Sequence, residues 1–234
     1  MENSQARANI LPTSILASMK IENASGLILR TRPLTETSLI VHWLTPELGR
    51  IATVAKGARR PKSPFAGKLD LFYAADFSFR RSRSSDLHNL REVKLHETHG
   101  AIREDILKLQ QAGYVAAFIE QATETETPLP EIYELVRGFL KLLCGQAPLP
   151  QNLFALELKL LRELGQEPDL DKTHLTPGTK KLVQSFLAGD GTGGSRLKLS
   201  ADQGSELRQF LHNFLIFHLG RLPRGRAAAL ADAD

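Results

Sequence analysis

The sequence is poor in the residues on which covalent frameworks and thiol-based metal sites depend. It has one cysteine, Cys144, among 234 residues. A single cysteine can form neither an internal disulfide nor a cysteine-based zinc site. Cys144 stands in an apolar, helix-like stretch, so we expect a buried and unreactive thiol. Long apolar runs are missing too. No stretch approaches the ~20 consecutive apolar residues of a membrane helix, and no membrane association is expected.

The first twenty residues show no hydrophobic periodicity. We expect residues 1–20 to form a disordered arm. The mildly apolar run from Ile10 to Met19 is broken by Pro12 and makes a poor signal peptide, so we expect a cytoplasmic protein. Because the patterned region begins directly after it, Met19 is an alternative start of the chain.

Catalytic motifs are scarce. We find no serine elbow, no phosphate-binding P-loop and no carboxylate cluster with metal-ligand spacing. The stretch from Gly189 to Gly194 has the form G-x-G-x-x-G but follows a helical pattern, so we expect a flexible loop. His96 and His99 have the spacing H-x-x-H with no third ligand nearby, which favours two surface histidines at a strand end. We therefore expect no enzymatic activity, no cofactor and no metal.

The charged residues are unevenly distributed. The whole chain carries a net charge of +4 at pH 7. The segment from Arg50 to Arg83 contains nine basic and two acidic residues, a net charge of +7. The segment from Glu120 to Glu134 contains five glutamates and no basic residue. Because the distribution of charge decides what a surface attracts, the first third of the chain is suited to a polyanionic partner.

The region between residues 21 and 99 has the pattern of short strands. Apolar, β-branched and aromatic residues form five runs, and Thr45–Gly49 has the residues of a tight turn. The runs are Leu27–Pro33, Ser38–Leu44, Arg50–Ala55, Phe72–Arg80 and Leu90–Leu95. Within the fourth run, Phe77 and Phe79 share one face. About five short strands in about 75 residues predict a small barrel of the OB type.

The hydrophobic period becomes helical near Gly100. Apolar stripes spaced at three and four residues predict helices over about 102–119, 132–143, 153–164, 179–188 and 207–217. Gly165 and Gly220 are placed to end two of them. The chain is therefore expected to be α+β, with a disordered arm at 1–20, an OB-fold DNA-binding domain at 21–99 and an all-helical domain at 100–234.

A basic loop follows the third predicted strand. The segment Lys56–Pro64 carries four cations and is stiffened by two prolines. Such a loop can follow a phosphate backbone, although a solvated surface loop has the same composition. We expect phosphate contacts first from the loop and second from the end of the fourth strand. The predicted DNA-binding residues are Lys56, Arg59, Arg60, Lys62, Arg80, Arg81 and Arg83.

Aromatic residues offer further surfaces. Trp43, Phe65, Phe72 and Tyr73 are candidates to stack on bases, but core packing is the favoured interpretation for each. The last predicted helix carries a stripe of Phe210, Phe214 and Phe217. Core packing is again the default, and a groove for a partner's peptide is the alternative.

Four stretches of the chain resemble the RecO family of recombination mediators. They are Gly26–Ser63 with its "KGARR" loop, Leu107–Leu143, the "FALELKLLRELGQEPDLD" stretch from Phe154 to Asp171, and "FHLGR" from Phe217 to Arg221. One departure concerns the four-cysteine zinc site that many relatives place after "PDLD". Thr173 and Thr176 stand where its first cysteine pair would be. We expect residues 172–200 to form a metal-free helix and loop.

The resemblance implies binding of single- and double-stranded DNA, strand annealing, and loading of the recombinase onto DNA coated by single-strand-binding protein. It also implies two partners, the RecR protein and the C-terminal tail of the single-strand-binding protein. Two other interpretations stay open. The first is a protein-interaction scaffold whose basic loop binds an acidic protein. The second is a hydrolase that uses His96, His99 or another acid–base pair.

Overall fold

A closed five-stranded β-barrel forms the first half of the protein. The computed structural model describes residues 21–189 and 198–231. The strands are β1 (Ile21–Pro33), β2 (Leu39–Thr45), β3 (Gly49–Ala55), β4 (Ala74–Arg80) and β5 (Leu87–Glu97), in the order β1-β2-β3-β5-β4. The predicted five-stranded OB-type barrel is confirmed. The expected N-terminal arm, the alternative start at Met19 and most of the glycine-rich loop lie outside the described residues.

The barrel closes because β1 pairs on both sides. Its N-terminal half pairs with β4 and its C-terminal half with β2, with a bulge between Ile28 and Arg30. Inside, the Trp43 ring stacks on Phe77 at 4.0 Å between centroids, and its indole N–H donates to the Thr53 hydroxyl at 2.8 Å. Phe77 and Phe79 are both buried in this core, so their predicted shared face is confirmed.

The second half of the protein is helical, as predicted. All five apolar stripes lie in helices, and Gly165 and Gly220 end two of them with left-handed φ angles of 71° and 75°. The helices are η2 (Gly100–Glu104), α1 (Ile106–Ala122), α2 (Pro130–Gly145), α3 (Pro150–Glu163), η3 (Leu170–Lys172), α4 (Pro177–Ala188), α5 (Ala201–Leu219) and α6 (Arg226–Ala229). None of the helices described between residues 21–189 and 198–231 could cross a membrane.

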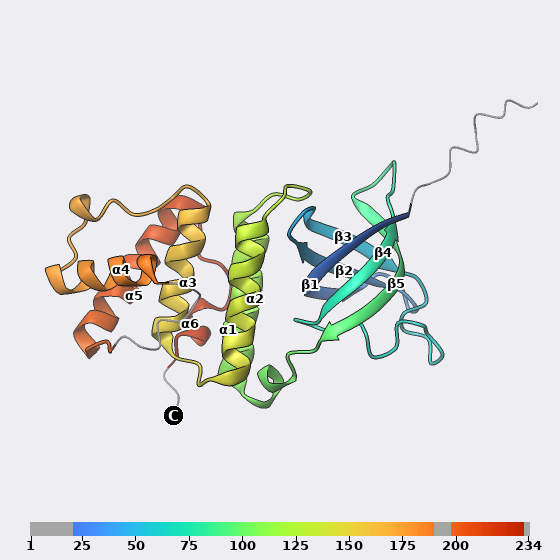
Figure 1. Cartoon of the computed structure of the whole chain (residues 1–234), viewed down its shortest axis with the longest axis horizontal. Helices are drawn as coiled ribbons and strands as arrows, with labels where there is room; N and C mark the ends of the chain where they lie inside the picture. Colours follow the sequence, from blue (N-terminus) through green and yellow to red (C-terminus); the bar gives the residue numbers. More distant parts are fainter. Residues whose placement is uncertain (1–20, 190–197, 232–234) are drawn as a thin grey trace, which may run out of the picture.

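The α1–α2 pair stands between the barrel and the remaining helices (Figure 1). One apolar core continues through this arrangement. It includes Leu27, Leu44 and Phe72 of the barrel region together with the buried faces of the helices. Gly49 at the start of β3 approaches the α1–α2 loop so closely that a Cβ atom would lie 1.7 Å from the Thr127 carbonyl oxygen. The barrel and helices are therefore packed through a shared, tightly fitted contact.

A buried ion pair fixes the C-terminal segment. The Arg226 guanidinium donates to both oxygens of Glu157 on α3, at 2.7 and 2.9 Å, and the Tyr114 hydroxyl donates to the same carboxylate. Arg226 and Glu157 are 4% and 1% exposed. A buried charge left without its partner is costly, so this pair holds residues after α5 against α1 and α3.

Candidate nucleic-acid interface

The basic loop is anchored at several points. It begins at Gly57, whose φ of 70° suits glycine, and continues through successive turns as far as the buried Phe65. The backbone N–H of Arg59 donates to the Thr37 carbonyl at 3.0 Å, and its guanidinium donates to the Thr35 carbonyl at 3.2 Å. The loop is thereby tied to the β1–β2 turn, which fixes the place from which its side chains project.

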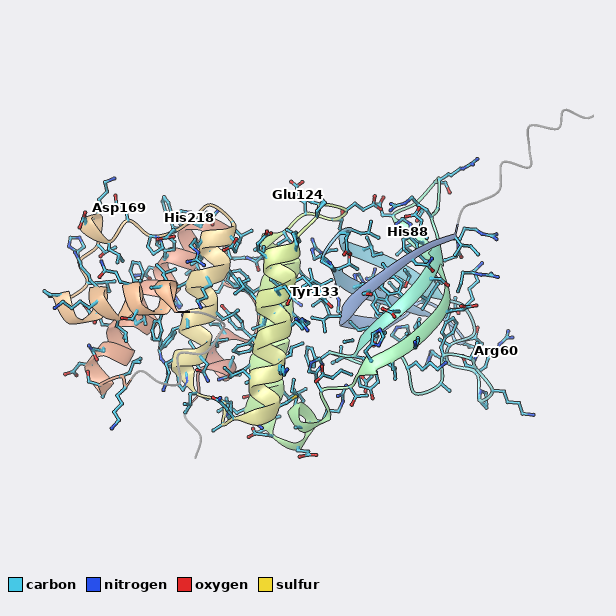
Figure 2. All side chains as sticks on the ribbon, in the orientation of Figure 1. Arg60, His88, Glu124, Tyr133, Asp169 and His218 are labelled. Atoms are coloured by element: carbon cyan, nitrogen blue, oxygen red, sulfur yellow. The ribbon has the colours of Figure 1, made fainter. Side chains whose placement is uncertain are left out.

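The four loop cations are uncompensated. Lys56, Arg59, Arg60 and Lys62 are all exposed. Within residues 21–189 and 198–231, no carboxylate forms an ion pair with any of them. Arg60 is labelled in Figure 2 on the side of the barrel away from the helices. The loop therefore presents a concentrated positive charge to solvent.

The other three predicted DNA-binding residues lie elsewhere on the barrel. Arg80, Arg81 and Arg83 come from the end of β4 and the β4–β5 hairpin. In Figure 2, His88, which contacts Arg81, is well separated from Arg60. Arg80 is partly buried and Arg83 is exposed. The structure thus brings together four of the seven predicted cations on one loop.

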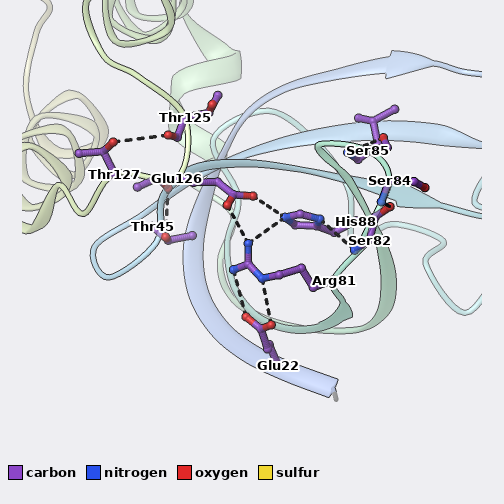
Figure 3. Close-up of polar contacts among 12 residues, drawn as sticks. Glu22, Thr45, Arg81, Ser82, Ser84, Ser85, His88, Thr125, Glu126 and Thr127 are labelled. Carbon is purple, nitrogen blue, oxygen red and sulfur yellow. Dashed lines mark hydrogen bonds and ion pairs between the residues drawn. The ribbon is translucent and has the colours of Figure 1, made fainter. Parts of the chain in front are cut away.

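Arg81 is held by two carboxylates (Figure 3). Its guanidinium lies 3.0 Å from Glu22 Oε1 on β1 and 2.8 Å from Glu126 Oε2 on the α1–α2 loop. The hydrogen bonds to Glu22 are the main reason why the pKa of Arg81 is raised. The two carboxylates neutralise the charge of Arg81, so we expect Arg81 to attract a phosphate less strongly than Arg60 does.

Most aromatic candidates for base stacking are in the core. Trp43, Phe65 and Phe72 are 0%, 6% and 3% exposed, as the favoured core interpretation predicted. Tyr73 is partly exposed, and the Arg103 guanidinium lies 4.9 Å from its ring centroid. A base could reach Tyr73 only on the ring face that Arg103 leaves open.

The two histidines of the H-x-x-H spacing do not form a site. His96 Nε2 pairs with Asp76 at 2.7 Å. His99 is 2% exposed and its Nδ1 lies 2.6 Å from the Phe72 carbonyl oxygen, so the prediction of a surface residue is wrong for His99. The left-handed backbone at His99, with φ of 47°, turns the chain from β5 into η2 and the ring into the core. No group of three or more potential metal ligands exists in the described part of the chain.

Threonine and glutamate side chains tie α4 to α5. Thr176, one of the two threonines at the expected cysteine positions, donates through its backbone N–H and hydroxyl to Glu206 at 2.6 and 2.9 Å. The buried Thr179 hydroxyl donates to the same carboxylate. Hydroxyl and carboxylate oxygens stand here in place of thiolates, so these residues do not fit a cysteine-based zinc site. Cys144 is only partly buried, contrary to expectation, and burial raises the pKa of its thiol.

A cleft between the barrel and the helices was not predicted from the sequence. It has a volume of about 470 Å³. The outer side of β1–β3 forms one wall, and α1 with residues 221–224 forms the other. Its cationic lining residues are Arg30, Arg50, Arg221 and Arg224. The alternating strand pattern in the sequence is enough to predict that the arginines on β1 and β3 face outward. Their approach to a segment about 170 to 190 residues later in the chain could not be predicted from that pattern.

The pKa of His42, which lines this cleft, is lowered. Burial first, and then the charges of Arg30, Arg32 and Arg50, lower its pKa from 6.5 to about 4. The imidazole is therefore neutral at neutral pH, surrounded by arginines that stay charged.

The aromatic stripe of α5 lies partly at the surface. Leu207, Leu211 and Leu215 are fully buried, whereas Phe217 is 82% exposed and Phe210 and Phe214 are partly exposed. The default prediction of core packing is therefore wrong for Phe217. His218, which packs on Phe214 at 4.3 Å, is labelled in Figure 2 on the far side of the molecule from Arg60. The alternative interpretation, a surface for a partner's peptide, stays open.

Comparison with known proteins agrees with this architecture. The family model "Recombination protein O N terminal" matches residues 19–99, and "Recombination protein O C terminal" matches residues 103–176. Among similar proteins, a DNA repair protein RecO from Rhodopirellula baltica is 32% identical over 61% of this chain and 53% of its own length. Another from Anaeromyxobacter dehalogenans strain 2CP-C is 28% identical over 84% of this chain and 91% of its own.

A DNA repair protein RecO from Listeria monocytogenes serotype 4a is 33% identical over 65% of this chain and 59% of its own length. The chain thus spans between a half and two thirds of several relatives that it matches. The two family models together cover more than half of the chain, in the order in which the barrel and the helices follow each other. The chain belongs to the RecO family of recombination proteins.

Proposed function

We propose that the protein serves DNA repair as a recombination mediator that binds single- and double-stranded DNA. It promotes annealing of complementary strands and helps to load the recombinase onto DNA coated by single-strand-binding protein. It acts by binding rather than by covalent catalysis. The observation that supports this proposal most directly is the anchored loop with four exposed cations and no carboxylate partner among the described residues.

Phosphate neutralisation is the physical basis of this activity. Two complementary strands repel each other because both are polyanions. A cationic surface lowers that repulsion and gains free energy from the release of condensed counterions. The loop at Lys56–Lys62 supplies such a surface, and Arg83 on the β4–β5 hairpin is a further exposed cation. Annealing and protein exchange need no bond to be made or broken, which agrees with a binding protein.

We further propose two protein partners, the RecR protein and the C-terminal tail of the single-strand-binding protein. The exposed aromatic side of α5, centred on Phe217, is suited to an extended apolar segment because apolar side chains bury area on such a surface. It lies away from the basic loop, so DNA and a peptide can be bound together.

The loop can be tested by fluorescence anisotropy with a labelled single-stranded oligonucleotide. The variant Arg60→Gln/Lys62→Gln removes two loop charges, and Lys180→Gln/Lys181→Gln on α4 removes two charges far from the barrel. Only the loop variant is expected to bind several-fold more weakly at low salt. Its slope of log K against log salt should fall by about 1.4, since each phosphate contact on a single strand contributes about 0.7. Unchanged affinity and slope would exclude the loop as the DNA site.

A second candidate function is a scaffold whose basic loop binds an acidic protein. The exposed Phe217 surface favours it, because both surfaces would then contact proteins. A competition experiment between single-stranded DNA and an acidic protein partner distinguishes the two candidate functions. If single-stranded DNA displaces no acidic partner and does not itself bind, the scaffold is the better description.

A further inference from the structure

We propose that the cleft between the barrel and the helical domain binds one single strand of nucleic acid, at a site separate from the basic loop. The inference rests on the proposed function and adds a second strand-binding site to it. The cleft is lined by Arg30 and His42 of the barrel and by Arg221 and Arg224 of the segment after α5. With two such sites, one protein molecule can bind both complementary strands at once, which brings them together for annealing.

The charges that remain after internal pairing favour a polyanion. Two of the three acidic lining residues are already engaged. Glu120 pairs with Arg30 at 3.1 Å, and Glu126 pairs with Arg81 at 2.8 Å. The third is Asp86, which is exposed. Arg221 and Arg224 have no carboxylate partner among the described residues. Arg50 forms no ion pair there either, although the nearby Glu120 carboxylate partly offsets its charge.

The arginine on the barrel side is held by neutral groups. The Arg50 Nε donates to the Thr123 hydroxyl at 2.8 Å, and a terminal nitrogen donates to the Thr123 carbonyl oxygen. These bonds fix the guanidinium without cancelling its charge. Burial lowers the pKa of Arg50, yet a guanidinium stays protonated at physiological pH.

The opposite wall is held firmly in place. The Gln121 side chain on α1 donates to the carbonyl oxygens of Leu219 and Arg221, at 3.3 and 2.7 Å. A few residues later, the buried Arg226–Glu157 pair anchors the same segment. Arg221 and Arg224 therefore project from a backbone that is fixed at both ends, which lowers the entropic cost of holding a ligand.

The dimensions and polarity of the cleft favour a single strand over a duplex. A volume of about 470 Å³ is in the range of ligand pockets of ~300–1,000 Å³, enough for one or two nucleotides at a time. A duplex occupies more space than this volume offers. His42 lines the cleft as a neutral ring, and its Nε2 atom is buried without a hydrogen-bond partner. Unlike a charged histidine, a neutral imidazole can accept a hydrogen bond from a base, and it can stack on one.

The cleft is also separate from the loop. Arg60 is labelled in Figure 2 on the outer side of the barrel, whereas the cleft is on the side that faces α1. Substitutions at the two sites can therefore be made and measured independently.

The test compares two double charge reversals with equal changes in net charge. Arg221→Glu/Arg224→Glu alters the cleft, and Lys180→Glu/Lys181→Glu alters α4. Arg221, Arg224 and Lys181 are exposed and Lys180 is partly exposed, so both variants should keep the thermal unfolding midpoint of the wild type within a few degrees. Two quantities are to be measured for each variant. The first is the affinity for a labelled single strand and for a labelled duplex, by fluorescence anisotropy. The second is the rate at which two complementary labelled strands anneal at low salt.

The cleft variant is expected to bind the single strand at least threefold more weakly, to anneal strands more slowly, and to bind the duplex as the α4 variant does. A photoreactive single strand should crosslink to the segment 219–226 in the wild type and not in the cleft variant. The proposal is overturned if the cleft variant behaves as the α4 variant does on the single strand. Equal losses on single strand and duplex also overturn it.

The loop variant Arg60→Gln/Lys62→Gln distinguishes a failure of the cleft proposal from a failure of the proposed DNA-binding function. If this variant weakens DNA binding and the cleft variant does not, the cleft proposal fails while the proposed function stands. If wild type, loop variant and cleft variant bind DNA equally weakly, with no salt dependence, the proposed function itself fails.

Discussion

The Glu126 carboxylate on the α1–α2 loop pairs with the Arg81 guanidinium at the end of β4, at 2.8 Å. The other oxygen of Glu126 lies 2.9 Å from His88 Nε2 on β5 (Figure 3). The Ser82 backbone N–H donates to His88 Nδ1 at 3.4 Å. Nε2 also lies 3.5 Å from Arg81, so the Glu126 carboxylate and the Arg81 guanidinium both contact the same ring nitrogen. The glutamate therefore links the helical half of the protein to both arms of the β4–β5 hairpin.

Removing this link should loosen the hairpin. Glu126→Ala removes the carboxylate that contacts Nε2 of His88, a residue only 2% exposed, and breaks the ion pair with Arg81. We expect the free energy of unfolding to fall by about 1–2 kcal/mol, the cost of leaving a buried polar group without a hydrogen bond. Amide hydrogen exchange of residues 81–88 should become faster. The exposed neighbour Glu124 provides the control: Glu124→Ala should change neither quantity. Equal exchange in both variants would show that Glu126 does not hold the hairpin.

Substitution of glycine by alanine should have opposite effects on stability at Gly49 and at Gly113. Gly49 has φ of 62°, and an added Cβ would lie 1.7 Å from the Thr127 carbonyl oxygen, where backbone meets backbone. Gly49→Ala should therefore destabilise the protein by more than about 2 kcal/mol, since overpacking and a left-handed alanine both cost free energy. Gly113 lies inside α1 with nothing within 4 Å of an added Cβ. Gly113→Ala should raise stability by about 0.5–1 kcal/mol through helix propensity. Urea denaturation measures both, and a stable Gly49→Ala protein would contradict the close contact between barrel and helices.

The parts of this structure that could be predicted from sequence are those encoded locally. Alternation of apolar residues located the strands, and spacing at three and four residues located the long helices. The four cations of the basic loop are neighbours in the chain, so their proximity needed no fold. The four-residue helix α6 is too short to show a period.

Contacts between distant segments could not be predicted in this way. Arg81 and Glu126 are 45 residues apart, and the arginines of the cleft come from both ends of the described chain. Hydrophobic periodicity states which side of an element is apolar but not which element covers it. For the same reason α5 was ambiguous. Its leucine stripe and its phenylalanine stripe both have helical spacing, and only packing decided that Leu211 is buried while Phe217 is exposed.

The lowered pKa of His42 predicts how stability depends on pH. Above about pH 6.5, His42 is neutral in both the folded and the unfolded protein and contributes no pH dependence. As the pH falls below 6.5, the unfolded chain binds a proton at His42, whereas the folded protein does so only near pH 4, because burial and three neighbouring arginines disfavour the charged ring. The unfolded state then binds more protons, so the free energy of unfolding decreases as the pH falls through this window.

The substitution His42→Gln removes this proton and should flatten the profile. At pH 5.0 the wild type is expected to have lost about 1 kcal/mol through His42 relative to pH 7.5, a value reduced from the full shift because the ring is partly exposed. The difference in unfolding free energy between the wild type and His42→Gln, measured in urea at both pH values, should therefore move by that amount in favour of the variant at pH 5.0. A difference that is the same at both pH values would mean that burial and the neighbouring arginines together do not keep His42 neutral at pH 5.0.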